Sequence, residues 1–242
     1  MTLIEDTRQQ SRKHDKKHKY WLSKKVYWRR TALDCGDYTL SGDSSICIDT
    51  KKDIDELIGD IQVKKMAKSK IEQKVDDICL KNGISLDLAK NIFHIICDDD
   101  EKRFVESELT FFCAENNIPE EVLAQFQELY VKRHGFFHRG LKRAQNSNIK
   151  LYILVDNKDG IKELDDLTSW VNPRMSRYNK IVEMHKQGKW KSVALPKGKP
   201  MPGEQLYKAC VTMEQKYGCK FLFCKPEESG QIILDLLGAE VT

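Results

Sequence analysis

The pattern of apolar and polar positions changes character twice along this chain of 242 residues. Short runs with a period of two, typical of strands, fill most of the first sixty residues. A period near 3.6, typical of amphipathic helices, dominates from about residue 63 to 131. Strand-like and helix-like runs then alternate to the end. The pattern predicts an α/β core that is interrupted once by a helical insertion.

The segment 1–62 forms the first part of the predicted core. It holds four strand-like runs, TLIEDT, VYWRRTAL, DYTL and SICIDTK, separated by turn residues. Asp53 then offers an N-cap to a helix, IDELIGDI. Its apolar residues fall at helical spacing: Ile54, Leu57, Ile58 and Ile61. We therefore expect strands and turns followed by a helix.

The insertion, 63–131, is rich in Lys and Glu and is predicted to be a small bundle of three to five helices. After it, IKLYILVDN is almost wholly apolar and suits a central strand that is buried on both faces. A helix-like run, IKELDDLTSWV, and a basic Pro/Gly-rich loop around 186–203 follow. Helix GEQLYKACVTMEQKYG, strand CKFLFCK and helix EESGQIILDLLG complete a discontinuous core of 1–62 and 132–242.

Composition excludes some classes of protein. Charged residues make up 32% of the chain, and no apolar run approaches the ~18 residues that a membrane span needs. The acidic start, without an apolar segment, does not resemble a secretion signal. We expect a cytoplasmic protein with no membrane partner. The eight cysteines then indicate reduced thiols rather than disulfides. No CxxC pair supports the alternative of a structural zinc site.

The net charge of +4 is unevenly distributed. Residues 1–30 hold ten Lys/Arg and three acids, and residues 132–150 hold six Lys/Arg and no acid. Basic clusters of this kind are typical of contact with a polyanion such as DNA. The predicted DNA-binding face of the second cluster consists of Arg133, Arg139, Lys142 and Arg143. Two alternatives remain: a solvated surface, or a structural helix that pairs with the nine acids of residues 98–121.

The run CGDYTLSGDSSICIDTKKDIDEL carries the chemistry. Asp37 begins one strand, and Asp49 and Lys51 lie two apart on the next, so that they project from one face. Asp55 follows on the first turn of the succeeding helix. Carboxylates that converge in this way suit Mg²⁺ or Mn²⁺, and a nearby Lys can orient a water and stabilise a charged transition state. Singly, each residue also fits a turn, a surface charge or a helix cap.

At this point the sequence resembles a family. Gly36-Asp37, Asp49-Thr50-Lys51 and Asp55 are similar to the G-D…(E/D)-R-K-x-x-x-D signature of the XPF-type nucleases in the PD-(D/E)XK superfamily. Asp6-Thr7-Arg8 resembles that family's D-T-R-E strand, which contributes a further carboxylate. The segment RHGFFHRGLKRAQNSNIKLYILVDN resembles the helix that precedes its fifth strand. The resemblance implies a restriction-endonuclease-like mixed sheet flanked by helices, with 63–131 as an inserted helical subdomain.

Three departures from the family pattern bear on activity. Asp49 stands where Glu is usual, Thr50 replaces an Arg, and Gln9 replaces the Glu of D-T-R-E. The tandem helix-hairpin-helix module of cellular members is not recognisable in the sequence. The chain therefore looks like the stand-alone type carried by phages and mobile elements, which would act in the host cytoplasm.

The resemblance and the residues together predict a Mg²⁺- or Mn²⁺-dependent DNA endonuclease that selects junctions, flaps or branches. The expected metal ligands are Asp6, Asp37, Asp49 and Asp55, with Lys51 serving the attacking water and Arg8 contacting phosphate. The alternative, favoured by Thr50 and Gln9, is an inactive nuclease-derived module that binds DNA or protein. A homodimer, and a protein partner for 63–131, both stay open.

Overall fold

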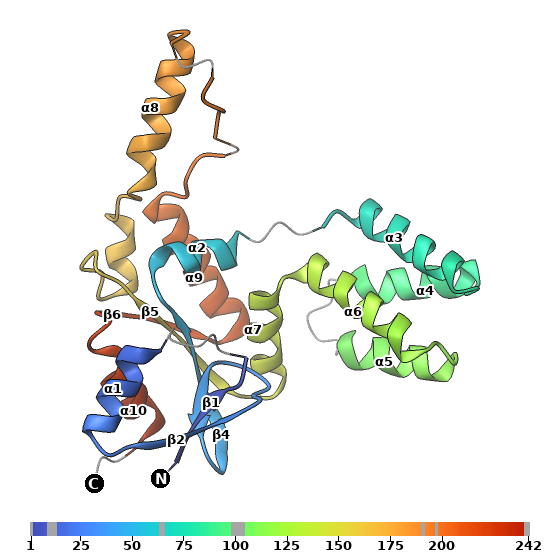
Figure 1. Cartoon of the computed structure of the whole chain (residues 1–242), viewed down its shortest axis with the longest axis horizontal. Helices are drawn as coiled ribbons and strands as arrows, with labels where there is room; N and C mark the ends of the chain where they lie inside the picture. The colour runs from blue at the N-terminus through green and yellow to red at the C-terminus, as the bar shows by residue number, and fades with distance from the viewer. Residues whose placement is uncertain are drawn as a thin grey trace. The chain divides into compact units, whose positions relative to one another are not determined.

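The chain folds as two compact units in the computed structural model, which describes residues 2–8, 14–62, 66–97, 105–189, 192–196 and 198–239. Unit 1 consists of Met1–Gly59 and Ser147–Thr242, and unit 2 of Asp60–Asn146 (Figure 1). Gln9 lies outside the described residues.

Unit 1 is built on a mixed sheet of six strands within its described residues. The strands are β1 (Thr2–Asp6), β2 (Tyr27–Thr31), β3 (Tyr38–Leu40), β4 (Asp43–Lys51), β5 (Lys150–Asp156) and β6 (Lys220–Cys224). Their order is β2-β1-β3-β4-β5-β6. β3 is antiparallel to β1 and β4, whereas β1/β2, β4/β5 and β5/β6 are parallel. The predicted α/β class, with all six predicted strands, is confirmed.

The pairing of β4 with β5 explains why the sequence can accommodate an insertion. Parallel neighbours need a crossover connection, because a tight turn cannot reverse the chain direction twice. The crossover from Lys51 to Lys150 contains all of unit 2. Most residues of β5 are buried, as expected for a central strand covered on both faces.

One face of the sheet is covered by α1 (Asp15–Ser23) and α10 (Ser229–Leu237). The core between them contains Trp21 of α1, Ile233, Leu234 and Leu237 of α10, and Leu3, Tyr38, Leu40, Ile48 and Leu154 of the sheet. The Trp21 indole Nε1 donates to the Gly230 carbonyl at 2.9 Å. A Cβ on Gly230 would lie 2.8 Å from the Tyr20 ring, so glycine allows the two helices to approach closely. The sequence pattern did not predict α1, because α1 buries only Lys17 and Trp21.

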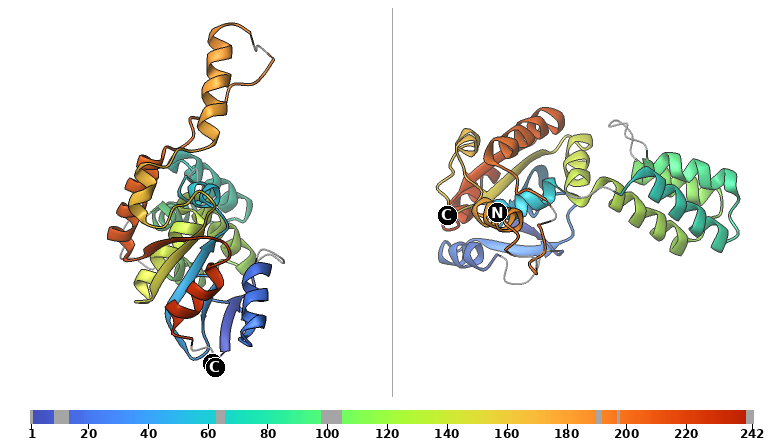
Figure 2. Two further views of the ribbon diagram at one scale, coloured as in Figure 1. Left: turned by 90° about the vertical axis from the view of Figure 1, so that its left-hand side faces the viewer. Right: turned by 90° about the horizontal axis from the view of Figure 1, so that it is seen from above.

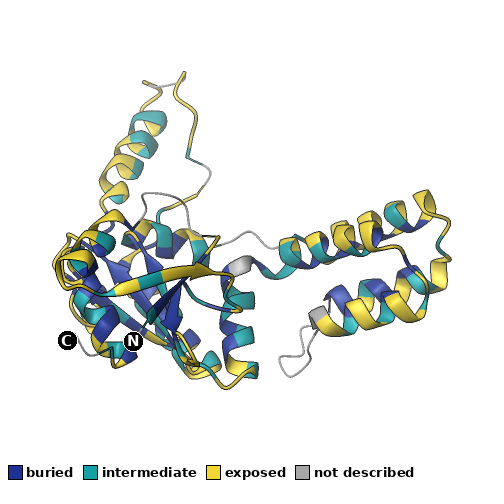
Figure 3. Ribbon diagram, turned by 60° about the horizontal axis from the view of Figure 1, so that its bottom comes forward, coloured by how far each residue is buried: buried dark blue, intermediate teal, exposed yellow. Residues whose placement is uncertain are grey.

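The remaining helices of unit 1 are α2 (Ile54–Ile61), the 3₁₀ helix η1 (Leu164–Thr168), α8 (Arg174–Lys186) and α9 (Gly203–Tyr217). In place of the expected helix over IKELDDLTSWV, the structure has only the short η1. α8 was not predicted, and it lies between that segment and the loop expected around 186–203. α8 has no buried residue, which explains the weak apolar period there (Figure 3).

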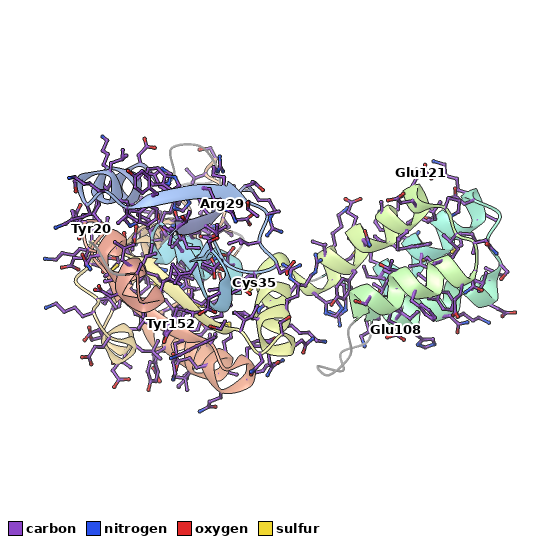
Figure 4. The ribbon with its side chains drawn as sticks, turned by 90° about the horizontal axis from the view of Figure 1, so that it is seen from below. Tyr20, Arg29, Cys35, Glu108, Glu121 and Tyr152 are labelled. Carbon is purple, nitrogen blue, oxygen red and sulfur yellow. The ribbon has the colours of Figure 1, made fainter. Side chains whose placement is uncertain are left out.

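Unit 2 is helical through its described residues, as its period predicts. It consists of α3 (Lys68–Lys81), α4 (Leu86–Cys97), α5 (Val105–Glu115), α6 (Glu120–His134) and α7 (Phe136–Asn146). Its own core includes Ile71, Val75, Ile92, Ile96, Leu109 and Phe126. Figure 4 labels Glu108 on α5 and Glu121 on α6, whose charged ends lie away from this core.

The expected boundary at residue 131 needs a correction. α6 runs on to His134 without a break, and Met66 N donates to the Lys132 carbonyl at 2.9 Å, which ties the start of unit 2 to its last long helix. Gly135, with φ of 78°, then separates α6 from α7. The segment 132–146 therefore belongs to the helical unit, not to the sheet-containing core.

Two further expectations concern the whole chain. All eight cysteines are buried and carry free thiols. Through the described ranges, no helix combines the length and the apolar character needed to cross a membrane.

We predict that the two units unfold as separate transitions, because each has its own core. All four tryptophans, at positions 21, 28, 170 and 190, belong to unit 1, so that tryptophan fluorescence follows unit 1 alone. Phe126→Ala should lower the stability of unit 2 by about 3–5 kcal/mol, the usual cost of emptying a fully buried aromatic site. Thermal melts followed by far-ultraviolet circular dichroism should shift, whereas the fluorescence midpoint should stay.

Leu154→Ala, in the core of unit 1, is the matched control and should shift the fluorescence midpoint instead. If Phe126→Ala moved both probes equally, the units would unfold as one.

Candidate active site

Acidic side chains gather where β1 and β4 end and β3 begins. Leu3, Tyr38 and Ile48 face α1 and α10. Because successive side chains of a strand alternate between faces, Asp6, Asp49 and Lys51 lie on the opposite face, while Asp37 directly precedes β3. The sequence predicted this shared face for Asp49 and Lys51, and the sheet register adds Asp6.

Gly36 fixes the approach of the chain to β3. Its φ of 70° lies in the left-handed region, and a Cβ there would be 3.0 Å from the Ile48 carbonyl oxygen. The close approach lets Asp37 N donate to that same oxygen at 2.7 Å. On its other side, the Asp37 carbonyl accepts from Asp6 N at 2.9 Å. Figure 4 labels Cys35 in the loop that leads to this point.

Asp37 is buried and held by Thr50. Its Oδ2 accepts from Thr50 N at 2.8 Å and from Thr50 Oγ1 at 2.5 Å. Burial, and then the negative charge of Asp49, raise the pKa of Asp37 to about 7, against the opposing hydrogen bonds from Thr50 and the charge of Lys51. A cation would favour the ionised form of such a carboxyl, so that Asp37 is a candidate metal ligand.

Asp49 and Lys51 complete this group. The Lys51 Nζ lies 2.8 Å from Asp49 Oδ1, and the side chains are 8% and 20% exposed, respectively. Asp49 thus remains open to solvent on one side, whereas Lys51 is nearly enclosed. The structure therefore brings together Asp37, Asp49 and Lys51, as the sequence predicted.

Asp6 and Arg8 form a separate pair beside Asp37. Arg8 Nε and Nη2 lie 2.8 and 2.7 Å from Asp6 Oδ2, and Arg8 Nη2 also donates to the Leu33 carbonyl. The hydrogen bond to Asp6, helped by the charges of Asp6, Asp34 and Asp37, raises the pKa of Arg8 against the opposing effect of burial. The Arg8 side chain is 58% exposed, so its guanidinium faces both Asp6 and solvent.

Asp55 lies apart from Asp37, on α2. Arg174 Nη2, on α8, approaches Asp55 Oδ2 to 2.9 Å. Asp55 also lines a cavity of about 350 Å³, together with Lys52, Asp53, Ile54, Asn157, Lys158, Asp159, Trp170, Pro173 and Pro226. Asp53 caps α2 as predicted, since its Oδ1 accepts from Glu56 N at 2.7 Å.

Two acids on the other face of the sheet have basic partners on α1. His18 Nε2 lies 2.6 Å from Glu5 Oε2, and Lys17 Nζ lies 3.0 Å from Asp156 Oδ2. Lys17 and Asp156 are both buried, so neither charge could stay there without the other. These pairs hold α1 on the sheet. The strand-end acids thus divide into Glu5 and Asp156, which are paired with α1, and a second set that is not.

The predicted DNA-binding face of residues 132–150 belongs to unit 2. Arg133 lies on α6, and Arg139, Lys142 and Arg143 lie on α7, all half-buried. The Arg139 guanidinium stacks over the Tyr130 ring at 5.2 Å, and burial followed by the charge of Arg143 lowers its pKa to about 10. Arg139 therefore has a packing role within unit 2 besides any contact with phosphate.

Within the described part of the chain, no group of three or more His, Cys, Asp or Glu is arranged to hold a metal ion. Asp37 and Asp49 are a pair, while Asp6 is bound by Arg8 and Asp55 by Arg174. Mg²⁺ takes one or two carboxylates together with waters and a phosphate oxygen, so that the pair fits it. Asp6 and Asp55 remain predictions as ligands, and each would first have to leave its arginine.

Sequence reasoning missed two residues of this site. Thr50 was read only as the loss of an arginine, yet it is the donor that holds Asp37. Because Thr50 lies between Asp49 and Lys51 on an apolar strand, a buried hydrogen-bond donor could have been expected there. Arg174 pairs with Asp55 across 119 positions, and no local pattern announces it.

Comparisons with models of protein families, with curated proteins and with solved structures find no match to this chain.

We predict that Gly36→Ala disturbs the site more than a change at another left-handed glycine. Alanine at φ of 70° costs about 1–2 kcal/mol, and its Cβ would also press on the Ile48 carbonyl. Gly42→Ala is the matched control, because Gly42 has φ of 86° with nothing within 4 Å. Calorimetry should show weaker Mn²⁺ binding for Gly36→Ala alone. Equal effects of both changes would refute the role of close packing.

We also predict a pH-dependent gain in stability for Asp37→Asn without metal. The folded-state pKa of Asp37 is about 7, above its unfolded value of about 3.9, so that wild type loses stability as pH rises through this window. Asn keeps an oxygen for Thr50 and has no charge to bury. In EDTA, the unfolding free energy of Asp37→Asn minus that of wild type should grow by roughly 1–3 kcal/mol from pH 4 to 8.

Asp43→Asn serves as the control of opposite sign. Hydrogen bonds from Ser45 lower the pKa of this exposed carboxylate. Its difference from wild type should not grow with pH. Parallel curves for the two variants would contradict the buried state of Asp37.

Proposed function

We propose that this protein is a Mg²⁺- or Mn²⁺-dependent endonuclease acting on DNA. The observation that carries the proposal is the group of Asp37, Asp49 and Lys51: a buried carboxyl beside a second one, with an enclosed ammonium 2.8 Å from the latter. Two acids and one lysine on the end of a single strand pair suit a metal, a phosphate and an attacking water.

Each residue has a definite role in this proposal. Asp37 and Asp49 hold the metal ion. When bound, a divalent cation supplies charge to a phosphate oxygen and makes water a better nucleophile. Lys51 orients the water and balances charge that develops on the phosphate. Arg8, more than half exposed beside Asp37, contacts a neighbouring phosphate.

The restriction-endonuclease-like fold belongs to the same proposal. It is supported by the mixed sheet, in which the candidate residues sit where β3 and β4 meet, and by helices on its faces. The likeness of Gly36-Asp37 and Asp49-Thr50-Lys51 to the XPF-type signature gains support from Gly36 itself. Its left-handed backbone and close approach account for a glycine in front of the aspartate. Selection of DNA branches rests on that resemblance alone.

A second candidate function is an inactive module that binds DNA or protein. Thr50 in place of arginine, and the arginine partners of Asp6 and Asp55, favour it, because they leave only two acids for a metal. Under this alternative, Asp37 and Asp49 are structural, and loss of either carboxylate leaves Mn²⁺ binding unchanged.

We predict that Asp49→Asn abolishes Mg²⁺-dependent cleavage and weakens Mn²⁺ binding at least tenfold without unfolding the protein. Asparagine keeps an oxygen for Lys51 but removes a charge that repels Asp37. Lys51→Met should keep Mn²⁺ affinity within a few-fold and lower the cleavage rate by roughly 10²–10⁴, the usual contribution of a positioned proton-transfer group. Cleavage is measured on labelled junction, flap and linear duplexes, and metal binding by calorimetry.

Asp43→Asn, the same change at the exposed start of β4, should behave as wild type in both assays. Cleavage of no substrate by a wild-type protein that binds Mn²⁺ would refute the nuclease proposal. Equal Mn²⁺ binding by wild type and Asp49→Asn would favour the inactive module.

A further inference from the structure

α8 and the segment after it form an exposed arm on unit 1. We define the arm as residues 174–199, of which the structure describes 174–189, 192–196, 198 and 199. α8 projects away from the sheet and from the other helices of unit 1 (Figures 1 and 2). None of its residues is buried. Because α8 contributes nothing to the core, packing does not account for its sequence.

The root of the arm is firmly held. Asn172, which is buried, donates through Nδ2 to the Met201 carbonyl at 3.0 Å, and its Oδ1 accepts from Arg174 N at 3.0 Å. Gly203 packs so closely on η1 and the residues after it that a Cβ would lie 2.1 Å from the Leu167 carbonyl oxygen. The two ends of the arm therefore meet at one fixed point, and the arm is presented from a rigid base.

The charge of the arm is one-sided. Its sequence holds eight Lys/Arg and a single acid, Glu183. The described cations of α8 and its end are exposed: Arg174, Arg177, Lys180, Lys186 and Lys189. In α3, a helix of similar length, lysines alternate with acids instead, as in most solvated helices. The charge of the arm is thus not the ordinary composition of an exposed helix.

The apolar residues of α8 lie on one side of the helix. Met175, Tyr178, Ile181 and Val182 fall within about a third of its circumference and are half-buried, whereas Arg177 and Lys180 lie outside this arc. His185 Nε2 contacts the Val193 carbonyl, which brings the returning segment against the helix. An interfacial membrane helix would instead leave a wide apolar face open. The arm therefore offers a partner mainly its cations, beside the exposed side chains of Val193 and Leu195.

The arm begins at a cavity that is lined by Lys52, the residue after Lys51 of the candidate site. Arg174, its first residue, pairs with Asp55, and Pro173 lines the same cavity as Asp55 and Lys52. α8, with 13 residues, is about 20 Å long, which matches about six base pairs of a duplex. A linear polyanion that passes the cavity would therefore meet cations along the length of the helix.

We propose that this arm binds the phosphate backbone of duplex DNA next to the site of cleavage. The inference rests on the proposed function for its ligand. It assigns to the arm a binding surface distinct from Arg8 and from the cluster of residues 132–150.

The test is DNA binding by the full chain in EDTA, in an Asp49→Ala background so that no cleavage intervenes. The triple variant Arg177→Gln, Lys186→Gln and Lys189→Gln removes three exposed cations. Each phosphate contact contributes about −0.9 to the slope of log affinity against log salt concentration on duplex DNA. With a labelled duplex, we expect the slope to become less steep by about 2 to 3 and binding at low salt to weaken at least tenfold.

The matched control neutralises three exposed lysines of α3, Lys70, Lys74 and Lys81, which changes the net charge by the same amount. It should leave the slope within about one of its original value. An unchanged slope in the arm variant, or an equal change in the α3 control, overturns the proposal.

Two competitors identify the ligand chemistry. Polyglutamate and vesicles with anionic phospholipids should displace far less labelled duplex than unlabelled duplex does at equal charge. If either competes as well as DNA, the arm is a general polyanion or membrane surface and the proposal fails. The outcome is independent of hydrolysis: a protein that cuts no DNA but shows the loss of slope supports the arm and refutes the nuclease. If the protein cuts DNA but the arm variant shows no loss of slope, only the proposal for the arm is refuted.

Discussion

The burial of one carboxyl group, that of Asp37, governs the geometry of the sheet edge. A charged group can occupy such a place only when hydrogen-bond donors or a cation replace its water. Thr50 provides two donors, one from the backbone and one from the side chain. Those bonds clamp the start of β3 to the end of β4, and the Asp37 backbone links both to β1. Three strands thus converge on one buried carboxyl group.

The acids at the strand ends differ in the partners that balance their charge. On the face toward α1, Glu5 and Asp156 each have a basic side chain from a single helix turn, His18 and Lys17. The result is a fixed helix and little free charge. Asp37 and Asp49 instead lie together, with Lys51 2.8 Å from Asp49. Two neighbouring acids of this kind are the basis of the proposed metal site.

How much the sequence predicts depends on the range of the interaction. The shared face of Asp49 and Lys51 follows from the period of a strand, and all six strands follow from local apolar patterns. α1 escaped because tertiary contacts of Trp21 stabilise it, not a continuous apolar stripe. The two arginine–aspartate pairs also differ in range. Asp6 and Arg8 are neighbours in the sequence, whereas the pair of Asp55 with Arg174 depends on where α8 is anchored.

The closed neck between Asn172 and Met201 gives the arm a freedom that the strands lack. Closing a loop whose ends are already fixed costs free energy that grows only with the logarithm of its length, about 0.6 kcal/mol for each doubling. Residues can therefore be gained or lost beyond the neck with almost no effect on the folding of the sheet. The length of the arm can therefore change in evolution independently of the sheet and of the residues at the root of the arm.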